Sequence, residues 1–173
     1  MRSSAASDVY KRQLLDYGAK ANIAKSLVKR GCQVTVYPAS TPASVILKEK
    51  YDGIMLSNGP GDPEENVQII EEIKLLASSQ TPIFAICLGH QLMALAHGFK
   101  TEKMKYGHHG ANHPVKDLET GRVYISTQNH NFVIKEDSID SAVAKPWFIN
   151  VNDKTIEGVT YLSLIHISEP TRH

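Results

Sequence analysis

The chain has only two cysteines, Cys32 and Cys87, which lie far apart among its 173 residues and form no paired-cysteine motif. This pattern fits a reducing compartment better than a disulfide scaffold, so we expect a cytoplasmic protein. No apolar run approaches the roughly 20 residues that span a bilayer, which argues against a membrane partner. Residues 1–13 also lack the apolar core of a secretory signal.

Excess charge of either sign is missing as well. The sequence has 19 Lys and Arg against 18 Asp and Glu, which gives a net charge of +1 at pH 7. Nothing in this balance indicates nucleic acid as a partner. The apolar share of 42% and the charged share of 21% are ordinary for a globular protein, and the length fits one domain with a sizeable core.

The first half of the chain alternates between strand and helix patterns. Short apolar runs predict strands at residues 14–18, 33–37, 52–56 and 82–86, and helical patterns follow them at 20–30, 41–50, 63–77 and 88–98. This alternation predicts an α/β fold with a mostly parallel sheet and helices on both faces. Ligands of such sheets bind beyond the carboxyl ends of the strands.

After Gly98 the pattern changes to short strands and turns. Strand patterns lie at residues 100–105, 122–127, 132–135, 142–150 and 155–161. We therefore expect a small antiparallel β portion in the C-terminal half.

Cys87 lies where the apolar run 82–86 meets the helical pattern that begins at Leu88. Strand, cysteine and helix form the layout of a nucleophile elbow, in which a tight turn exposes the side chain at the top of a sheet. The N-terminus of the helix would favour the thiolate, the form that attacks carbonyl carbons. A lone cysteine is more often buried and inert, but the small residues Ala85 and Gly89 favour a nucleophile here.

A loop with Gly59, Pro60 and Gly61 follows the 52–56 strand at the same predicted sheet edge. Glycines would let the backbone approach a ligand closely, although a simple turn would also use them. The loop lacks the lysine of a phosphate-binding P-loop, so the sequence predicts no nucleotide site in it.

Five segments resemble known sequences, and they occur in the order 16–23, 56–63, 86–91, 103–115 and 127–132. The first three resemble class I (triad-type) glutamine amidotransferases. The last two are similar to the small, glutamine-hydrolysing chains of carbamoyl-phosphate synthases. The resemblance implies the flavodoxin-like fold of that family, and it is far more specific than a glycine loop alone.

In that family a cysteine thiolate attacks the side-chain amide of L-glutamine and releases ammonia to a large synthetase chain. The resemblance implies that Cys87 is the nucleophile and that backbone N–H groups of Leu88 and Gly59 form the oxyanion hole. No cofactor is expected here, because ATP, Mg²⁺ and bicarbonate would bind the large chain, which makes carbamoyl phosphate for arginine or pyrimidine biosynthesis. The implied glutamine contacts are Gly59, Gly61, Leu88, Gln91, Asn129, Asn131 and Phe132.

Plainer interpretations stay open for several of these residues. Gln91 also suits an ordinary helix, and residues 129–132 suit a plain hairpin turn. His108, His109 and His113 invite a metal interpretation, but no Cys or carboxylate at zinc spacing accompanies them, so we predict no metal.

The sequence departs from the family pattern at several positions. Ala85 and Asn131 stand where glycine is usual, and asparagine tolerates a positive φ better than most residues. The family completes its triad with a downstream His-Pro-Glu segment. His166 and Glu169 have the wrong spacing and flanks for that segment, so neither receives a catalytic role, and Cys87 is expected to be essentially inactive without its base.

Both ends of the chain lack the periodicity of the rest. We interpret residues 1–13 and 162–173 as non-native-looking tails on a partial amidotransferase domain, residues 14–161.

Two other functions stay open, beside a third and weaker one, a different hydrolase with a nucleophile elbow on the same kind of sheet. One is an amidotransferase of another pathway, such as anthranilate or GMP synthesis, against which the histidine-rich segment 103–115 argues. The other is a non-catalytic module that binds glutamine or serves as a scaffold, in which the absence of the triad histidine and glutamate would be genuine. Glutamine binding without reaction at Cys87 would favour the second.

Overall fold

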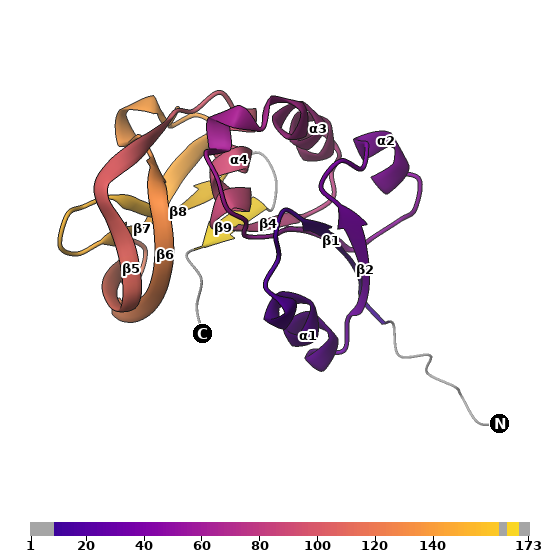
Figure 1. The fold of residues 1–173 in the computed structure, drawn as a ribbon, viewed down its shortest axis with the longest axis horizontal. Helices are drawn as coiled ribbons and strands as arrows, with labels where there is room; N and C mark the ends of the chain where they lie inside the picture. The colour runs from indigo at the N-terminus through magenta and orange to yellow at the C-terminus, as the bar shows by residue number, and fades with distance from the viewer. Residues whose placement is uncertain (1–8, 163–165, 170–173) are drawn as a thin grey trace.

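The computed structural model describes residues 9–162 and the backbone of residues 166–169 (Figure 1). The first strands are β1 (Lys11–Asp16), β2 (Gln33–Pro38), β3 (Gly53–Leu56) and β4 (Ile83–Ile86). They pair in parallel in the order β2-β1-β3-β4. The predicted parallel sheet is therefore confirmed.

Helices connect these strands and cover both faces of the parallel sheet. They are α1 (Ala21–Lys29), α2 (Ala43–Ile46), α3 (Val67–Ser78) and α4 (Leu88–Ala96), with a 3-10 turn η1 (Pro63–Glu65) before α3. Figure 1 shows α2, α3 and α4 above the strands and α1 below them. In the part of the chain that is described, none of these helices has the length and apolar character needed to cross a membrane.

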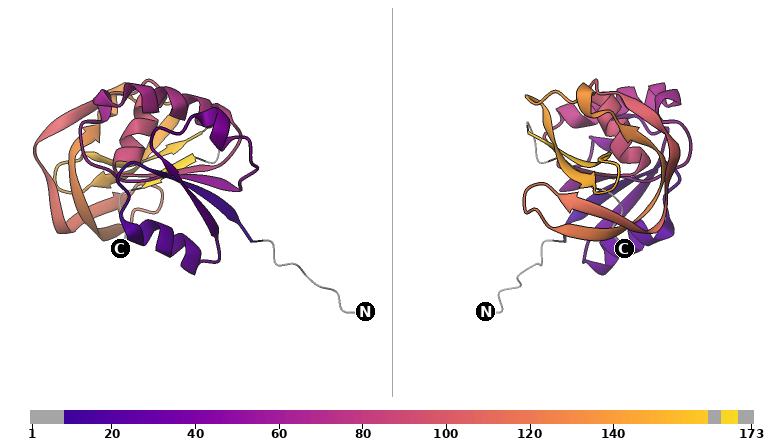
Figure 2. Two further views of the ribbon diagram at one scale, coloured as in Figure 1. Left: turned by 45° about the vertical axis from the view of Figure 1, so that its right-hand side comes forward. Right: turned by 90° about the vertical axis from the view of Figure 1, so that its left-hand side faces the viewer.

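The second half of the chain is antiparallel. It consists of β5 (Thr101–Asp117), β6 (Val123–Ile134), the 3-10 turn η2 (Glu136–Ser138), β7 (Ala144–Asn150) and β8 (Ile156–Tyr161). β5 pairs with β6 and β7, and β8 pairs with β6 and β7, so the four strands close on themselves (Figure 2). The predicted antiparallel portion is confirmed.

β5 and β6 are longer than the short strands that the sequence predicts. β6 joins the predicted strands at 122–127 and 132–135 into one, and β5 continues well past residue 105. The register of β5 against β6 shifts between Lys103 and His108 and again between Gly110 and His113. Because such irregularities interrupt the alternation of buried and exposed side chains, the periodicity of β5 is not readable from the sequence.

The two halves are joined through a short strand, β9 (His166–Glu169). It pairs in parallel with β4 and antiparallel with β8, which makes one nine-stranded sheet in the order β2-β1-β3-β4-β9-β8-β6-β5-β7. The backbone of these residues forms a strand, although they belong to the predicted tail 162–173. The side chains of His166 and Glu169 lie outside what the structure describes.

β1 begins three residues before the predicted domain boundary at residue 14. Gln13 is buried, and its side-chain amide donates a hydrogen bond of 2.7 Å to the carbonyl oxygen of Ile46. In a sequence, a polar side chain that makes its hydrogen bonds inside the core cannot be distinguished from a solvent-exposed one. The start of the strand was therefore not predicted. The non-native origin of the two tails stays a prediction.

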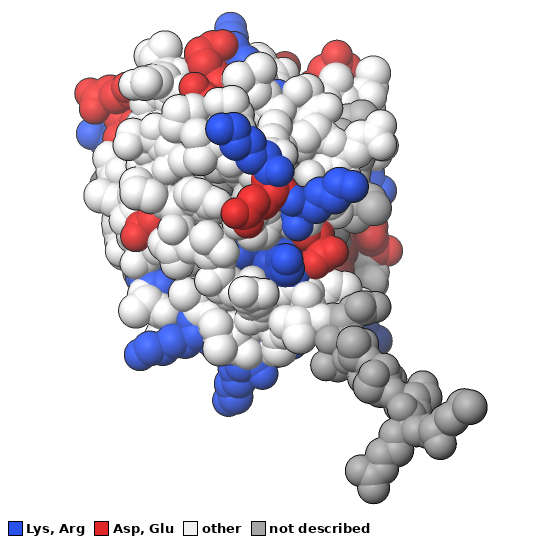
Figure 3. All heavy atoms as spheres, turned by 90° about the vertical axis from the view of Figure 1, so that its right-hand side faces the viewer, with Lys and Arg blue, Asp and Glu red and all other residues white. Residues whose placement is uncertain are grey.

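Charged side chains are mixed over the surface. Figure 3 shows basic and acidic groups interleaved on the face of the molecule that carries β2, and no large field of one sign is visible there. This agrees with the small net charge of the chain.

Two adjacent leucines of α3 differ in burial, and replacing each one shows which side of the helix packs against the core. Leu76 is 0% exposed, whereas Leu75 is 56% exposed. We expect Leu76→Ala to lower the free energy of unfolding by about 2–5 kcal/mol, because it removes buried methyl groups and leaves a cavity. The matched variant Leu75→Ala should change it by about 0.5 kcal/mol or less. Urea denaturation measures both, and equal losses would contradict this packing of α3.

Candidate active site

Cys87 occupies the turn between β4 and α4 and is the residue that precedes the helix. Its φ is 51° and its ψ is −111°, and Lys154 is the other non-glycine residue with positive φ among those described. Such a conformation costs about 1–3 kcal/mol, so its surroundings must impose it. The strained turn between strand and helix is the geometry that the nucleophile elbow requires.

Gly89 makes this tight turn possible. Its N–H donates a hydrogen bond of 3.0 Å to the carbonyl oxygen of Ser57. A β-carbon on Gly89 would lie 2.6 Å from the carbonyl oxygen of Leu56, closer than real β-carbons come. The helix therefore begins in direct contact with the end of β3, and only glycine fits at this position.

The glycine loop lies against the same turn. A β-carbon on Gly59 would stand 2.1 Å from the carbonyl oxygen of Tyr17 and 2.8 Å from a methyl group of Leu88. Gly61 has a φ of +101°, which also favours glycine. Packing thus requires glycine at position 59, backbone conformation favours it at position 61, and the loop is held beside the Leu88 side chain.

The predicted substrate residues come together in one groove. A cavity of about 1270 Å³ runs along the face of the sheet that α1 covers and reaches the elbow and β6. Leu88 is buried and is the one predicted site residue that does not line it. The predicted residues that line it are Gly59, Gly61, Cys87, Gln91, Asn129, Asn131 and Phe132.

Gln91 links the two halves of the molecule at this groove. Its side-chain amide donates a hydrogen bond of 2.7 Å from α4 to the carbonyl oxygen of Phe132 on β6. Gln91 is also buried, and its role in binding glutamine stays a prediction. The segment from Asn129 to Phe132 belongs to the long strand β6, and the plain hairpin turn is wrong for it.

His109 holds the two asparagines of this segment. Its Nδ1 lies 2.7 Å from Oδ1 of Asn129, and its Nε2 lies 3.0 Å from Oδ1 of Asn131. Asn131 is not among the described residues with positive φ. The expectation that asparagine is suited to this position because it tolerates a positive φ is therefore wrong. Its side chain instead lies over Gly107, where a β-carbon would come within 2.5 Å of Asn131 Oδ1.

The electrostatics of Cys87 differ from the expectation. Burial raises the pKa of the Cys87 thiol, and this outweighs the Leu88 N–H and the charge of Lys20, which both act to lower that pKa. The helix N-terminus thus favours the thiolate as predicted, but the pKa of Cys87 is raised overall, because the effect of burial is larger. The Sγ–H points to the carbonyl oxygen of Asn129 at 4.0 Å, a weak contact that gives the thiol no base.

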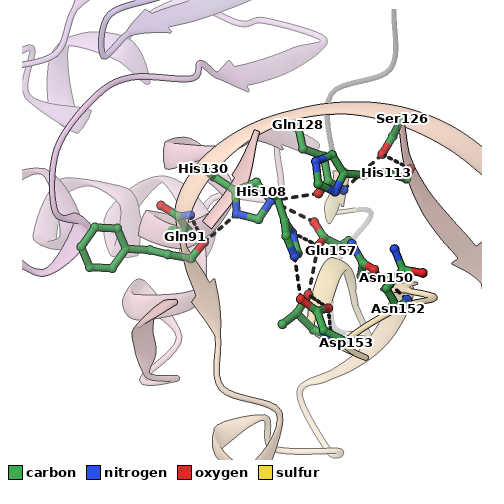
Figure 4. A network of polar contacts seen from close by, with 12 residues as sticks. Gln91, His108, His113, Ser126, Gln128, His130, Asn150, Asn152, Asp153 and Glu157 are labelled. Carbon is green, nitrogen blue, oxygen red and sulfur yellow. Dashed lines mark hydrogen bonds and ion pairs between the residues drawn. The ribbon is translucent and has the colours of Figure 1, made fainter. Parts of the chain in front are cut away.

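A buried polar network lies behind the groove, and sequence reasoning missed it (Figure 4). Glu157 on β8 is 4% exposed and lies 2.9 Å from Nδ1 of His108 and 3.2 Å from Nε2 of His130. The hydrogen bond with Glu157 raises the pKa of His108 to about 9, with a further contribution from Asp153. The residues come from three strands and from the loop before β8, so no local spacing in the sequence reveals them.

Comparison of the sequence with models of protein families identifies the family of this chain. The model of the family described as "Glutamine amidotransferase class-I" matches residues 13–167. The chain belongs to this family.

Curated relatives of this amidotransferase chain are carbamoyl phosphate synthase small chains. That of Pseudomonas syringae pv. tomato is 54% identical over 147 residues, which cover 83% of this chain and 38% of the relative. That of Thioalkalivibrio sulfidiphilus is 50% identical over 154 residues, 89% of this chain and 40% of the relative. The chain thus spans about two fifths of the length of these relatives.

Solved structures share the amidotransferase fold at lower sequence identity. A putative GMP synthase protein from Thermoplasma acidophilum superimposes with a TM-score of 0.80 at 19% identity, covering 93% of this chain and 82% of that one. A glutamine amidotransferase from Thermotoga maritima gives a TM-score of 0.70 at 14% identity, with 92% and 74% covered. The predicted flavodoxin-like amidotransferase fold is confirmed.

The raised pKa of the amidotransferase cysteine predicts how it reacts with alkylating agents. In a Cys32→Ser background, the rate of Cys87 alkylation by iodoacetamide should keep rising with pH beyond the titration of a free thiol, because burial delays formation of the reactive thiolate. Mass spectrometry of the modified peptide measures the rate at each pH. A plateau reached near neutral pH would show that the thiolate is stabilised rather than disfavoured.

Proposed function

We propose that this domain is the glutamine-binding part of a glutaminase of the carbamoyl-phosphate synthase type. In the whole protein it would hydrolyse L-glutamine through a thioester on Cys87 and supply ammonia to a large synthetase chain. The single observation that carries the proposal is the positive φ of Cys87, a strained elbow beside a groove that contains the glycine loop and the Asn129–Phe132 segment. The small-chain relatives at 50% and 54% identity support the choice of pathway.

The proposed chemistry uses the groove as follows. The thiolate of Cys87 attacks the side-chain carbonyl carbon of glutamine, and the C–N bond breaks with release of ammonia. The oxyanion that forms in between would accept hydrogen bonds from the backbone N–H groups of Leu88 and Gly59, a proposal supported by the close packing of Gly59 against the Leu88 side chain. Water then cleaves the thioester to glutamate and the free thiol.

The groups that hold glutamine would lie on both halves of the molecule. The glycine loop and Gln91 come from the parallel half, whereas Asn129 and Asn131 come from β6. Because His109 already positions both asparagines, their amides would meet the substrate with little loss of side-chain entropy.

We infer that the chain as given binds glutamine but hydrolyses it very slowly. The attacking thiol needs a proton acceptor, and its raised pKa makes this need greater. His90 is unsuited to this role, because burial lowers its pKa to about 4 and both of its ring nitrogens are buried without a hydrogen-bond partner among the described residues. His130 is held by Glu157 and by the carbonyl oxygen of Phe132.

Calorimetry and a hydrolysis assay test the two parts of this proposal separately. We expect L-glutamine to bind the wild-type chain and the Cys87→Ala variant with similar affinity, and glutamate release by the wild type not to exceed that of the variant. Failure of both chains to bind glutamine would contradict the proposed site.

Glutamate release that depends on Cys87 would contradict the inferred lack of activity and support the proposed chemistry. Labelling by the thiol-trapping analogue 6-diazo-5-oxo-L-norleucine adds a further test. It should modify Cys87 slowly and leave Cys32 unmodified, because the analogue reacts only where a glutamine site positions it. Equal labelling of the two cysteines would contradict a glutamine site at Cys87.

A further inference from the structure

Three potential metal ligands converge inside the antiparallel half of the molecule, and one of them, His130, also lines the groove. His108 on β5, His130 on β6 and Glu157 on β8 each place one ligand atom within 4.8 Å of the other two. Figure 4 shows the two imidazole rings and the carboxylate pointing toward one another. All three side chains are buried or nearly so.

The outer nitrogen of each histidine has a partner that can only accept a hydrogen bond. His108 Nε2 lies 2.7 Å from Oδ2 of Asp153, and His130 Nδ1 lies 2.9 Å from the carbonyl oxygen of Phe132. A proton on each of these outer nitrogens satisfies that partner and leaves the inner nitrogen of a neutral ring able to bind a metal ion. Histidines that bind metals show this arrangement, in which the outer N–H donates to a carboxylate or a backbone carbonyl.

The inner nitrogens face oxygen atoms. His108 Nδ1 stands 2.9 Å from Oε1 of Glu157. His130 Nε2 stands 3.2 Å from Oε2 of Glu157 and 3.3 Å from Oε1 of Gln128. Each of these contacts needs a positive charge between nitrogen and oxygen, which a proton on the imidazole supplies in the metal-free chain and a metal ion would supply in its place.

The two histidine–glutamate contacts of 2.9 Å and 3.2 Å have the spacing of ligands on a tetrahedral ion, and the three ligand atoms, which lie within 4.8 Å of one another, would draw closer on binding. Zn²⁺ binds imidazole nitrogen and carboxylate oxygen at about 2.0–2.1 Å, so neighbouring ligands stand roughly 3.3 Å apart. A small cavity of about 30 Å³ lies against His130 and Glu157, which is room for about one water molecule in a remaining coordination position. Two histidines and a glutamate are a ligand set that zinc uses in proteins.

We propose that His108, His130 and Glu157 bind one divalent metal ion of the zinc type, with Asp153 orienting His108. The ion would join β5, β6 and β8 behind the groove and hold the part of β6 that carries the predicted substrate contacts. The prediction of no metal rested on His108, His109 and His113, and the structure assembles a different set. The metal site goes beyond the proposed function and needs neither glutamine nor Cys87 to bind the ion, and His130 is the one ligand that also lines the groove.

Titration of the metal-free chain with Zn²⁺ tests the proposal. A Cys32→Ser, Cys87→Ser background removes thiol ligands from the measurement. We expect one equivalent to bind and to raise the melting temperature, and Co²⁺ in its place should give the visible absorption bands of a four-coordinate site. The absence of binding, or binding that requires the thiols, would overturn the proposal.

Variants show where the ion binds. Glu157→Gln should weaken Zn²⁺ binding at least about tenfold, because it removes a ligand charge. Asp153→Asn, on a partly exposed side chain, should weaken it by about tenfold without disturbing the core, and serves if Glu157→Gln fails to fold. The matched control His109→Gln, on the neighbouring exposed histidine, should leave the affinity unchanged. Equal affinity in all of these variants, or a loss in the His109 variant alone, would overturn the assignment.

Discussion

The candidate site depends on one backbone conformation, the positive φ of Cys87 between β4 and α4. The strain is tolerated because both sides of the turn are fixed. β4 is held in register between β3 and β9, and α4 begins with Gly89 pressed against the end of β3. A larger residue at Gly89 would move the helix away, and the sulfur would then lose its place at the head of the groove.

The groove is assembled from segments that are distant in the sequence. The parallel half supplies the cysteine and the glycine loop, and the antiparallel half supplies the segment around Asn129 and Phe132. The hydrogen bond from Gln91 to Phe132 ties these halves together at the groove. The relative position of the two halves therefore matters as much for the site as any single residue does.

The sequence predicted the parallel half well, because each strand is a short apolar run and each helix has a clear periodicity. It predicted the gathering of Cys87 with the glycine loop, since the carboxyl ends of parallel strands meet at one edge. It failed for Gln13, whose polar amide is satisfied inside the core, and for β5, whose bulges break the alternation.

Two features could not be predicted from the sequence, and the physical reason is the same for both. They are the polar network around Glu157 and the rise in the pKa of Cys87 on burial. Both depend on which residues of distant strands become neighbours and on how much water they exclude. Spacing along a chain carries that information for a helix or a hairpin, but not for a side chain on β8 that meets histidines on β5 and β6.

The closure of β7 onto β8 has a consequence for how the molecule meets its neighbours. Among the described strands, β2 has one side that is wholly unpaired, whereas β5 and β6 each have a second side that is paired over a short stretch. Strand addition by a second molecule would therefore begin at β2, where Pro38 shortens the row of available N–H donors. That edge lies at the far end of the molecule from β5 and β6 (Figure 1), so self-association there would leave the Asn129–Phe132 wall of the groove accessible.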